Sequence, residues 1–98
     1  MSYAIYVLRD PLTNEDRYVG CTKRPLHERL SCHMSEAKAH HFREKPTWVW
    51  LRGLSKMERR PIIALIDEAP TQDLAYAIES WWIAHKRSQG DDLLNFFA

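Results

Sequence analysis

The sequence predicts an α+β fold in which a small sheet is flanked by helices. With 98 residues, the chain has room for one domain, residues 1–98. Three short runs rich in β-branched and aromatic residues have strand length, at 3–8, 17–19 and 61–66. Three other stretches carry helix signals, at 25–36, 48–51 and 71–87. The resulting order, ββααβα, is typical of a sheet with helices packed around it.

The first two strands are expected to form an antiparallel hairpin. Asp10-Pro11 ends the first run, and the polar residues 13–16 supply turn chemistry. The connection is short, which favours an antiparallel pair. Gly20 is expected to end the second strand. The continuous apolar run at 61–66 predicts a third, buried strand.

The first helix is predicted from its apolar spacing. Pro25 suits the first turn of a helix. Leu26, Leu30 and Met34 then recur every four residues and form one apolar stripe. Arg29 lies along the edge of that stripe, so polar chemistry borders the buried face of this helix.

The other helices have recognisable ends. Thr47 opens the short second helix, and Gly53 is expected to end it. Thr71 is the expected N-cap of the longest helix, and Gly90 is its expected stop. Residues 93–96 are expected to close the chain in an extended or irregular segment.

Composition sets limits on function. The chain has 14 Lys plus Arg against 13 Asp plus Glu, a net charge of +1. Non-specific affinity for DNA comes mainly from neutralising phosphates. A DNA-acting protein of this charge therefore concentrates its cations on one face or relies on another module.

Cysteine usage and hydropathy indicate the compartment. Cys21 and Cys32 are too few for a disulfide framework, which favours a reduced, cytoplasmic chain. The N-terminus lacks the basic region of a signal peptide, and no run reaches the ~20 apolar residues of a membrane span. We therefore expect no membrane partner.

Glu79 is out of place on the apolar longest helix. No cation occupies its helical neighbour positions, which hold Ala75, Tyr76, Trp82 and Ile83. Burying an unpaired carboxylate is costly. One interpretation is a salt bridge to a distant Arg or an exposed edge position. The other is a ligand for a hard divalent cation.

Arg29 and His33 share one edge of the first helix, four residues apart. They are either a solvent-facing pair or a phosphate-binding guanidinium beside a proton shuttle. Tyr6 and Tyr18 lie on the two hairpin strands. Each is either a packing residue or a hydroxyl presented to a shared cleft.

A loose group of Cys and His residues raises the alternative of a zinc-stabilised interaction domain. Structural zinc ligands are usually paired at tight spacing. Here ten residues separate the two cysteines, which disfavours a zinc site. The residues concerned are Cys21, His27, Cys32, His33, His40 and His41.

Taken together, these positions resemble the GIY-YIG nuclease family. The resemblance runs from residue 4 to residue 95 and depends on five features in the right order. They are Ala4-Ile5-Tyr6, Tyr18-Val19-Gly20, Arg29, Glu79 and Asn95. Ala4 replaces the first glycine of the family's motif, which adds one methyl group and leaves the tyrosine intact. The resemblance implies a small three-stranded antiparallel sheet flanked by helices.

The resemblance also implies an activity, that of a divalent-metal-dependent DNA endonuclease using Mg²⁺ or Mn²⁺. Glu79 would bind the metal, and Arg29 the scissile phosphate. Tyr6 or His33 would act as the general base, an alternative that stays open. Tyr18 would position water or phosphate, and Asn95 would orient Glu79 or its metal waters.

Further residues concern the DNA. Lys23, Arg24 and His40 are candidates for nucleic-acid contact. His33 matches a histidine of the homing and phage branch of the family, and either His40 or its neighbour His41 matches a second one. Homing members carry a separate DNA-binding region, whereas this chain stops three residues after Asn95. We expect a free-standing nuclease or a catalytic piece that works with another domain or a second copy. The alternative is a non-cutting nucleic-acid-binding module on the same fold.

Overall fold

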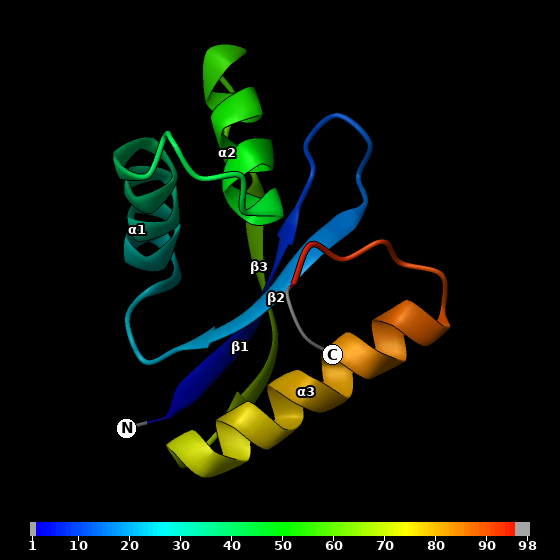
Figure 1. Cartoon of the computed structure of the whole chain (residues 1–98). Helices are drawn as coiled ribbons and strands as arrows, with labels where there is room; N and C mark the ends of the chain where they lie inside the picture. Colours follow the sequence, from blue (N-terminus) through cyan, green and yellow to red (C-terminus); the bar gives the residue numbers. More distant parts are fainter. Residues whose placement is uncertain (1, 96–98) are drawn as a thin grey trace.

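The computed structural model describes residues 2–95 and confirms the expected α+β architecture and element order (Figure 1). The elements are β1 (Tyr3–Arg9), β2 (Asp16–Thr22), α1 (Leu26–Ala39), α2 (Pro46–Lys56), β3 (Ile62–Ala69) and α3 (Gln72–Ser88). The strands form one antiparallel sheet in the order β2-β1-β3. In Figure 1 the strands run between α3 on one side and α1 with α2 on the other.

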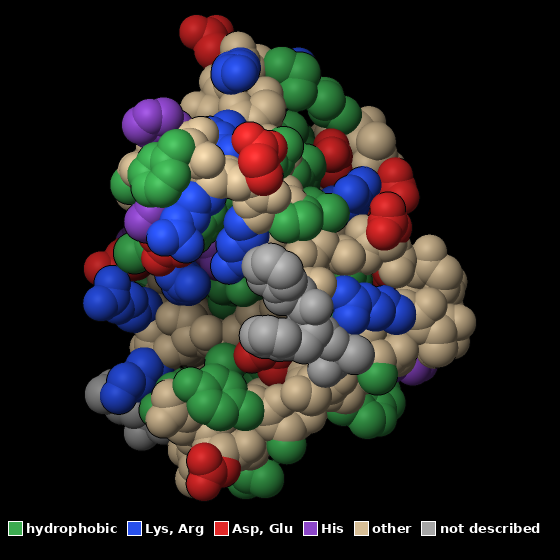
Figure 2. Space-filling view, in the orientation of Figure 1, with side chains coloured by type: hydrophobic (Ala, Val, Ile, Leu, Met, Phe, Trp, Pro, Cys, Tyr) green, Lys and Arg blue, Asp and Glu red, His purple; other side chains and the backbone are tan. Residues whose placement is uncertain are grey.

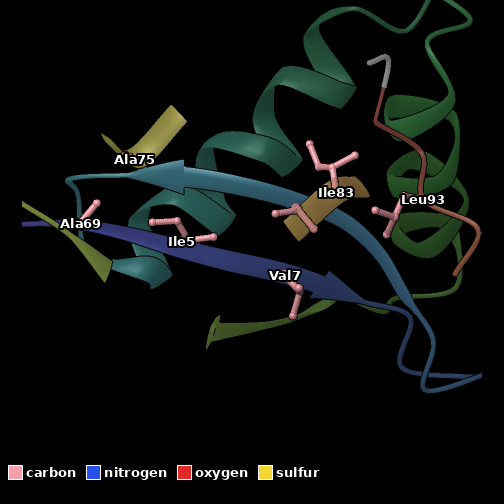
Figure 3. Packing of buried hydrophobic residues seen from close by; sticks show 7 residues of the cluster. Ile5, Val7, Ala69, Ala75, Ile83 and Leu93 are labelled. Atoms are coloured by element: carbon pink, nitrogen blue, oxygen red, sulfur yellow. The ribbon is translucent and has the colours of Figure 1, made fainter. Parts of the chain in front are cut away.

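The central strand β1 organises the core because both of its faces are covered. Ile5, Tyr6, Val7 and Leu8 are each at most 1% exposed. Ile5 and Val7 belong to the main apolar cluster, which also takes in residues of α3 (Figure 3). That cluster also contains Val19, Ala69, Ala75, Ile83 and Leu93. Successive side chains alternate across a strand, so Tyr6 points the other way, towards α1.

A second apolar cluster joins α1 to α2. Its buried members are Met34, Ala37 and Leu51. Of the predicted stripe on α1, Leu30 and Met34 pack here, and Leu26 is only partly buried. The two helices therefore form a unit of their own on one side of the sheet.

Two strand predictions were wrong. The third strand was expected to be buried, but β3 is an edge strand that pairs only with β1, and Ile62 and Leu65 are 45% and 49% exposed. Its apolar run also continues to Ala69. Gly20 was expected to end β2, but the strand continues to Thr22. Gly20 instead lies opposite Tyr6 in the ladder.

The predicted bounds of α2 were also wrong. The helix begins at Pro46, which occupies the first turn, and passes through Gly53 to Lys56. A Cβ atom at Gly53 would meet nothing within 4 Å, so neither strain nor crowding ends the helix there. Thr47 is buried, and its hydroxyl donates to the carbonyl of Leu94 at 3.3 Å.

The predicted ends of α3 are confirmed. The Thr71 hydroxyl accepts a hydrogen bond from the Leu74 amide at 3.3 Å, as an N-cap does. Gly90, with φ of +95°, follows the C-cap. Residues 93–95 are irregular, and Phe96 of the predicted last segment lies outside the described residues. Within residues 2–95, the longest and most apolar helices still fall short of what a bilayer crossing requires.

Gly53→Ala should stabilise the protein. Alanine loses less conformational entropy than glycine in a helix, and its methyl group meets no neighbour here. We expect the free energy of unfolding to rise by about 0.5–1 kcal/mol, measured from urea unfolding. Gly90→Ala is the matched control and should destabilise, because its φ of +95° is strained for alanine. A Gly53→Ala variant less stable than the parent would contradict this account of α2.

Candidate active site

Five of the predicted site residues come together from four elements. Tyr6 lies on β1, Tyr18 on β2, Arg29 and His33 on α1, and Glu79 on α3. The Tyr6 and Tyr18 ring centroids are 6.5 Å apart, and that of His33 lies 5.9 Å from Tyr6 and 5.2 Å from Tyr18. The charges of Arg29 and Glu79 both act on the two phenols. These residues, far apart in the sequence, therefore lie within interaction range of one another.

The closest contact in this cluster joins Tyr6 to His33. The Tyr6 Oη and His33 Nε2 atoms are 2.6 Å apart, and the two side chains are 1% and 3% exposed. Burial, followed by the positive charges of Arg29 and Lys45, lowers the pKa of His33 to about 3. The imidazole is therefore neutral at neutral pH and retains one nitrogen that can accept a proton.

Gly20 makes room for the Tyr6 phenol. A Cβ atom at position 20 would lie 2.5 Å from Tyr6 Oη and 2.6 Å from Tyr6 Cζ. It would also lie 3.0 Å from the Tyr18 ring. Because Tyr6 is fully buried, its ring has no free space into which to move. Sequence reasoning placed Gly20 at a strand end and missed this steric role.

Both phenols are protonated at neutral pH in this state. Burial is the main cause that raises the pKa of Tyr6, and Tyr18 raises it further. Arg29 lowers the Tyr6 pKa, but burial outweighs it. The pKa of Tyr18 is raised by burial and then by the negative charge of Glu79. Arg29 alone therefore does not bring the pKa of Tyr6 below its ordinary value in the free protein.

Glu79 is partly buried and has an unexpected neighbour. Burial raises its pKa, while a hydrogen bond from the Cys21 thiol lowers it. The same environment raises the pKa of Cys21 to about 12, first through burial and then through Glu79. Among residues 2–95, no Lys or Arg forms an ion pair with Glu79. Sequence reasoning considered Cys21 only as a zinc ligand and missed this contact.

Arg29 is tethered on the surface side of the cluster. Its Nη1 atom lies 3.4 Å from Oε1 of Glu36, two turns along α1. The Glu36 side chain is 44% exposed, so the pair is open to solvent and weak. A phosphate oxygen can therefore replace this carboxylate at low cost. Glu36 was also absent from the sequence-based site.

Asn95 lies against β2. Its side-chain oxygen accepts from the Val19 amide at 2.9 Å, and its side-chain nitrogen donates to the Val19 carbonyl at 2.7 Å. Within the part of the chain that the structure describes, it forms no hydrogen bond with Glu79. The Asn95 amide thus holds the strand segment between Tyr18 and Gly20.

The predicted nucleic-acid contacts lie at the two ends of α1. Just before the helix, the Lys23 ammonium lies 5.8 Å from the Tyr3 ring centroid, and Arg24 donates to the Cys32 sulfur at 3.6 Å. His40 is the C-cap residue. Figure 2 shows Lys and Arg side chains gathered over α1 and the loop to α2. On this face of the molecule, several cations therefore lie close together, although the net charge of the chain is only +1.

The donor set limits the kind of metal site. Across residues 2–95, no three His, Cys, Asp or Glu side chains form a group that could hold a metal ion. The cluster offers one carboxylate, Glu79, which is partly buried without a cationic partner. Mg²⁺ binds through one or two carboxylates and keeps several waters, so this single ligand fits it.

Comparison with known protein families gave a match that covers most of the chain. A family profile described as the GIY-YIG catalytic domain matches residues 2–92. The matched range contains Tyr6, Tyr18, Arg29, His33 and Glu79, and Asn95 lies beyond its end. Searches of curated proteins and of solved structures returned no match.

The buried, neutral His33 should make stability depend on pH. Its pKa is about 3 in the fold and near 6.5 when unfolded, so the unfolded chain binds one more proton between those values. His33 therefore lowers the free energy of unfolding as pH falls through this range, by at most about 1.4 kcal/mol per pH unit. The effect should be visible in urea unfolding of the parent and of His33→Gln between about pH 7 and pH 5.

The difference in the free energy of unfolding between the parent and His33→Gln isolates the contribution of His33. Because the pKa of Glu79 is raised in the fold, Glu79 increases the free energy of unfolding as pH falls. It does so in the parent and in His33→Gln alike, so its effect is absent from the difference. We expect the parent to lose stability relative to His33→Gln as the solution is acidified. Parallel curves would contradict the buried, neutral state of His33.

Proposed function

The chain belongs to the GIY-YIG family of nuclease catalytic domains, and from this premise we propose that it is a divalent-metal-dependent endonuclease that hydrolyses DNA phosphodiester bonds. The observation that carries the proposal is the buried 2.6 Å contact between Tyr6 and His33, beside Arg29 and Glu79. Hydrolysis requires an activated water, a balanced negative charge on the phosphate and a stabilised leaving oxygen. The cluster contains a group suited to each requirement.

Tyr6 and His33 act together in activating water. In the tautomer protonated at Nδ1, His33 accepts the hydroxyl proton of Tyr6 at Nε2. Tyr6 Oη takes a proton from the attacking water as its own proton passes to His33. The phenol then never has to exist as a resting phenolate, which its raised pKa forbids.

The substrate itself prepares His33 for this step. In the free protein, Arg29 is one of the charges that lower the His33 pKa. A phosphate bound to Arg29 offsets that charge and adds a negative charge nearby, so it favours the protonated imidazole. Proton acceptance is thereby coupled to the presence of DNA.

The other groups position the substrate and the metal ion. Arg29 binds the scissile phosphate in place of Glu36, and Tyr18 orients the water or the phosphate by hydrogen bond. Glu79 would hold Mg²⁺ or Mn²⁺, with the Cys21 thiol fixing the carboxylate. A metal bound there supplies Lewis-acid stabilisation of the leaving oxygen. Asn95 holds β2 so that Tyr18 and Gly20 keep their places.

DNA is held at both ends of α1 in this proposal. Lys23 and Arg24 contact phosphates at one end, and His40 contacts the nucleic acid at the other. Because a net charge of +1 gives little general affinity, a separate DNA-binding domain or a second copy contributes the remainder. One active site cuts one strand at a time, so a second copy also provides a route to double-strand cleavage. The place of His33 four residues after Arg29 favours the homing and phage branch.

Tyr6→Phe should remove most of the activity. The substitution keeps the ring in place and deletes the hydroxyl that relays the proton, so we expect nicking of supercoiled plasmid in Mg²⁺ to slow by about 10²–10⁴-fold. Tyr76→Phe is the matched control, because its hydroxyl lies on the exposed surface of α3. A loss of less than about tenfold for Tyr6→Phe would assign the general base to His33 alone.

Glu79→Gln should abolish cutting and preserve DNA binding. The amide has nearly the same shape as the carboxylate but lacks the charge that holds a divalent cation. We expect no plasmid nicking in Mg²⁺ or Mn²⁺, with the same affinity for labelled DNA in EDTA. Glu68→Gln, an exposed carboxylate at the end of β3, should retain the parent rate.

Two outcomes of that experiment would redirect the proposal. Full activity of Glu79→Gln would contradict the metal role. A parent protein that binds DNA but never nicks it, with Mg²⁺ or Mn²⁺ present, would identify a non-cutting nucleic-acid-binding module.

A further inference from the structure

We propose that the loop between α1 and α2 carries a stacking platform for an unpaired base of the DNA substrate. This inference rests on the proposed nuclease function and adds a preference for substrates with unpaired bases. The aromatic platform consists of His40, Phe42 and Trp48. None of these rings takes part in the proton relay or the metal site.

The geometry of the platform is that of a stacking site. The His40 and Trp48 rings are stacked, with centroids 4.6 Å apart and planes 12° from parallel. Phe42 lies edge-on to His40 at 6.2 Å and is 67% exposed. A hollow of about 660 Å³ adjoins the Phe42 and Trp48 rings and is lined by residues 42–45 and Trp48. His40 and Trp48 are half-buried, so the exposed Phe42 ring beside the hollow is the face that a planar ligand meets first.

The charges around the hollow match a nucleotide. The Arg43 guanidinium lies 5.8 Å from the Phe42 ring centroid, and the Lys45 ammonium lies 4.8 Å from that of Trp48. Glu44 also lines the hollow, so its lining residues carry two positive charges and one negative. Aromatic rings for the base and neighbouring cations for the phosphate are the combination that holds single-stranded nucleic acid. A purely apolar partner would not need the cations.

The loop is held in shape before any ligand binds. The Arg52 guanidinium donates to three backbone carbonyls, those of Ala37 and His40 at 3.0 Å each and that of Arg43 at 2.6 Å. These bonds fix the backbone on both sides of Phe42. A ligand therefore does not have to order this loop, which lowers the entropic cost of binding.

The platform is continuous with the candidate active site. Lys45, which lies over the Trp48 ring, is close enough to His33 for its charge to act on the imidazole. His40 caps the helix that also carries Arg29 and His33. A DNA strand whose phosphate is bound at Arg29 can therefore place a neighbouring unpaired base on the platform.

The test compares the affinity of the protein for a single strand that carries bases with its affinity for an abasic strand. Fluorescein-labelled oligothymidylate of roughly 12 nucleotides and an abasic oligonucleotide of equal length carry the same phosphates. Anisotropy titrations in EDTA measure both affinities without cleavage. Stacking of one base should make the parent bind oligothymidylate at least about fivefold more tightly than the abasic strand.

Phe42→Ala should remove this preference and leave the affinity for the abasic strand unchanged. Phe42→Tyr should restore it, because the ring is kept. Trp81→Ala is the matched control and should keep the preference. Trp81 is 57% exposed and stacks on His85 at 4.8 Å and 9°, but it lies on α3. Far-ultraviolet circular dichroism verifies that each variant is folded.

Equal affinities of the parent for the two strands would overturn the inference, as would a Phe42→Ala variant that keeps the preference. These results are separable from a failure of the proposed function. A chain that prefers the strand with bases but never cuts DNA would contradict the nuclease activity alone. A chain that nicks plasmid without any preference for bases would contradict the platform alone.

Discussion

The hydrogen bond between Tyr6 and His33 is the contact on which the rest of this structure depends. Tyr6 stands on the central strand and is almost wholly buried, so its hydroxyl needs a partner inside the protein. His33 meets that need and thereby fixes α1 against the sheet. Arg29, one turn earlier on the same helix, is placed beside Tyr6 as a result. The contact that satisfies a buried polar group is thus also the one that assembles the proposed reacting groups.

Burial shifts the pKa values of the titratable side chains in this site towards their uncharged forms. The pKa values of Tyr6, Tyr18, Cys21 and Glu79 are raised, and that of His33 is lowered, with burial the largest cause in every case. Each shift favours the uncharged form. Arg29 keeps its charge and, through its solvent-open pair with Glu36, remains accessible to phosphate. In such a site, a bound phosphate and a divalent cation alter the local field far more than they would in water.

Local pattern and family resemblance predicted the order of elements and the residues that meet in the site. Arg29 and His33 could be paired because helical spacing alone brings i and i+4 together. The features that sequence reasoning missed depend on long-range packing. The register that sets Gly20 against Tyr6, the bond of Cys21 to Glu79 and the bond of Asn95 to Val19 all join distant segments. The edge position of β3 has the same origin, because an apolar run looks alike in a central and an outer strand.

The position of the Tyr6 phenol depends on the absence of a side chain at Gly20. The site is therefore shaped in part by a residue that has no reactive group. Because the Tyr6 phenol fills the volume where a Cβ would stand, even a methyl group there collides with the Tyr6 ring on that face of the sheet. A survey of tolerated substitutions would consequently place position 20 among the least replaceable in the chain, alongside residues that touch substrate. Substitutions at position 20 would fail because of the neighbouring Tyr6 ring. A position that tolerates no substitution is therefore not always one that takes part in the chemistry.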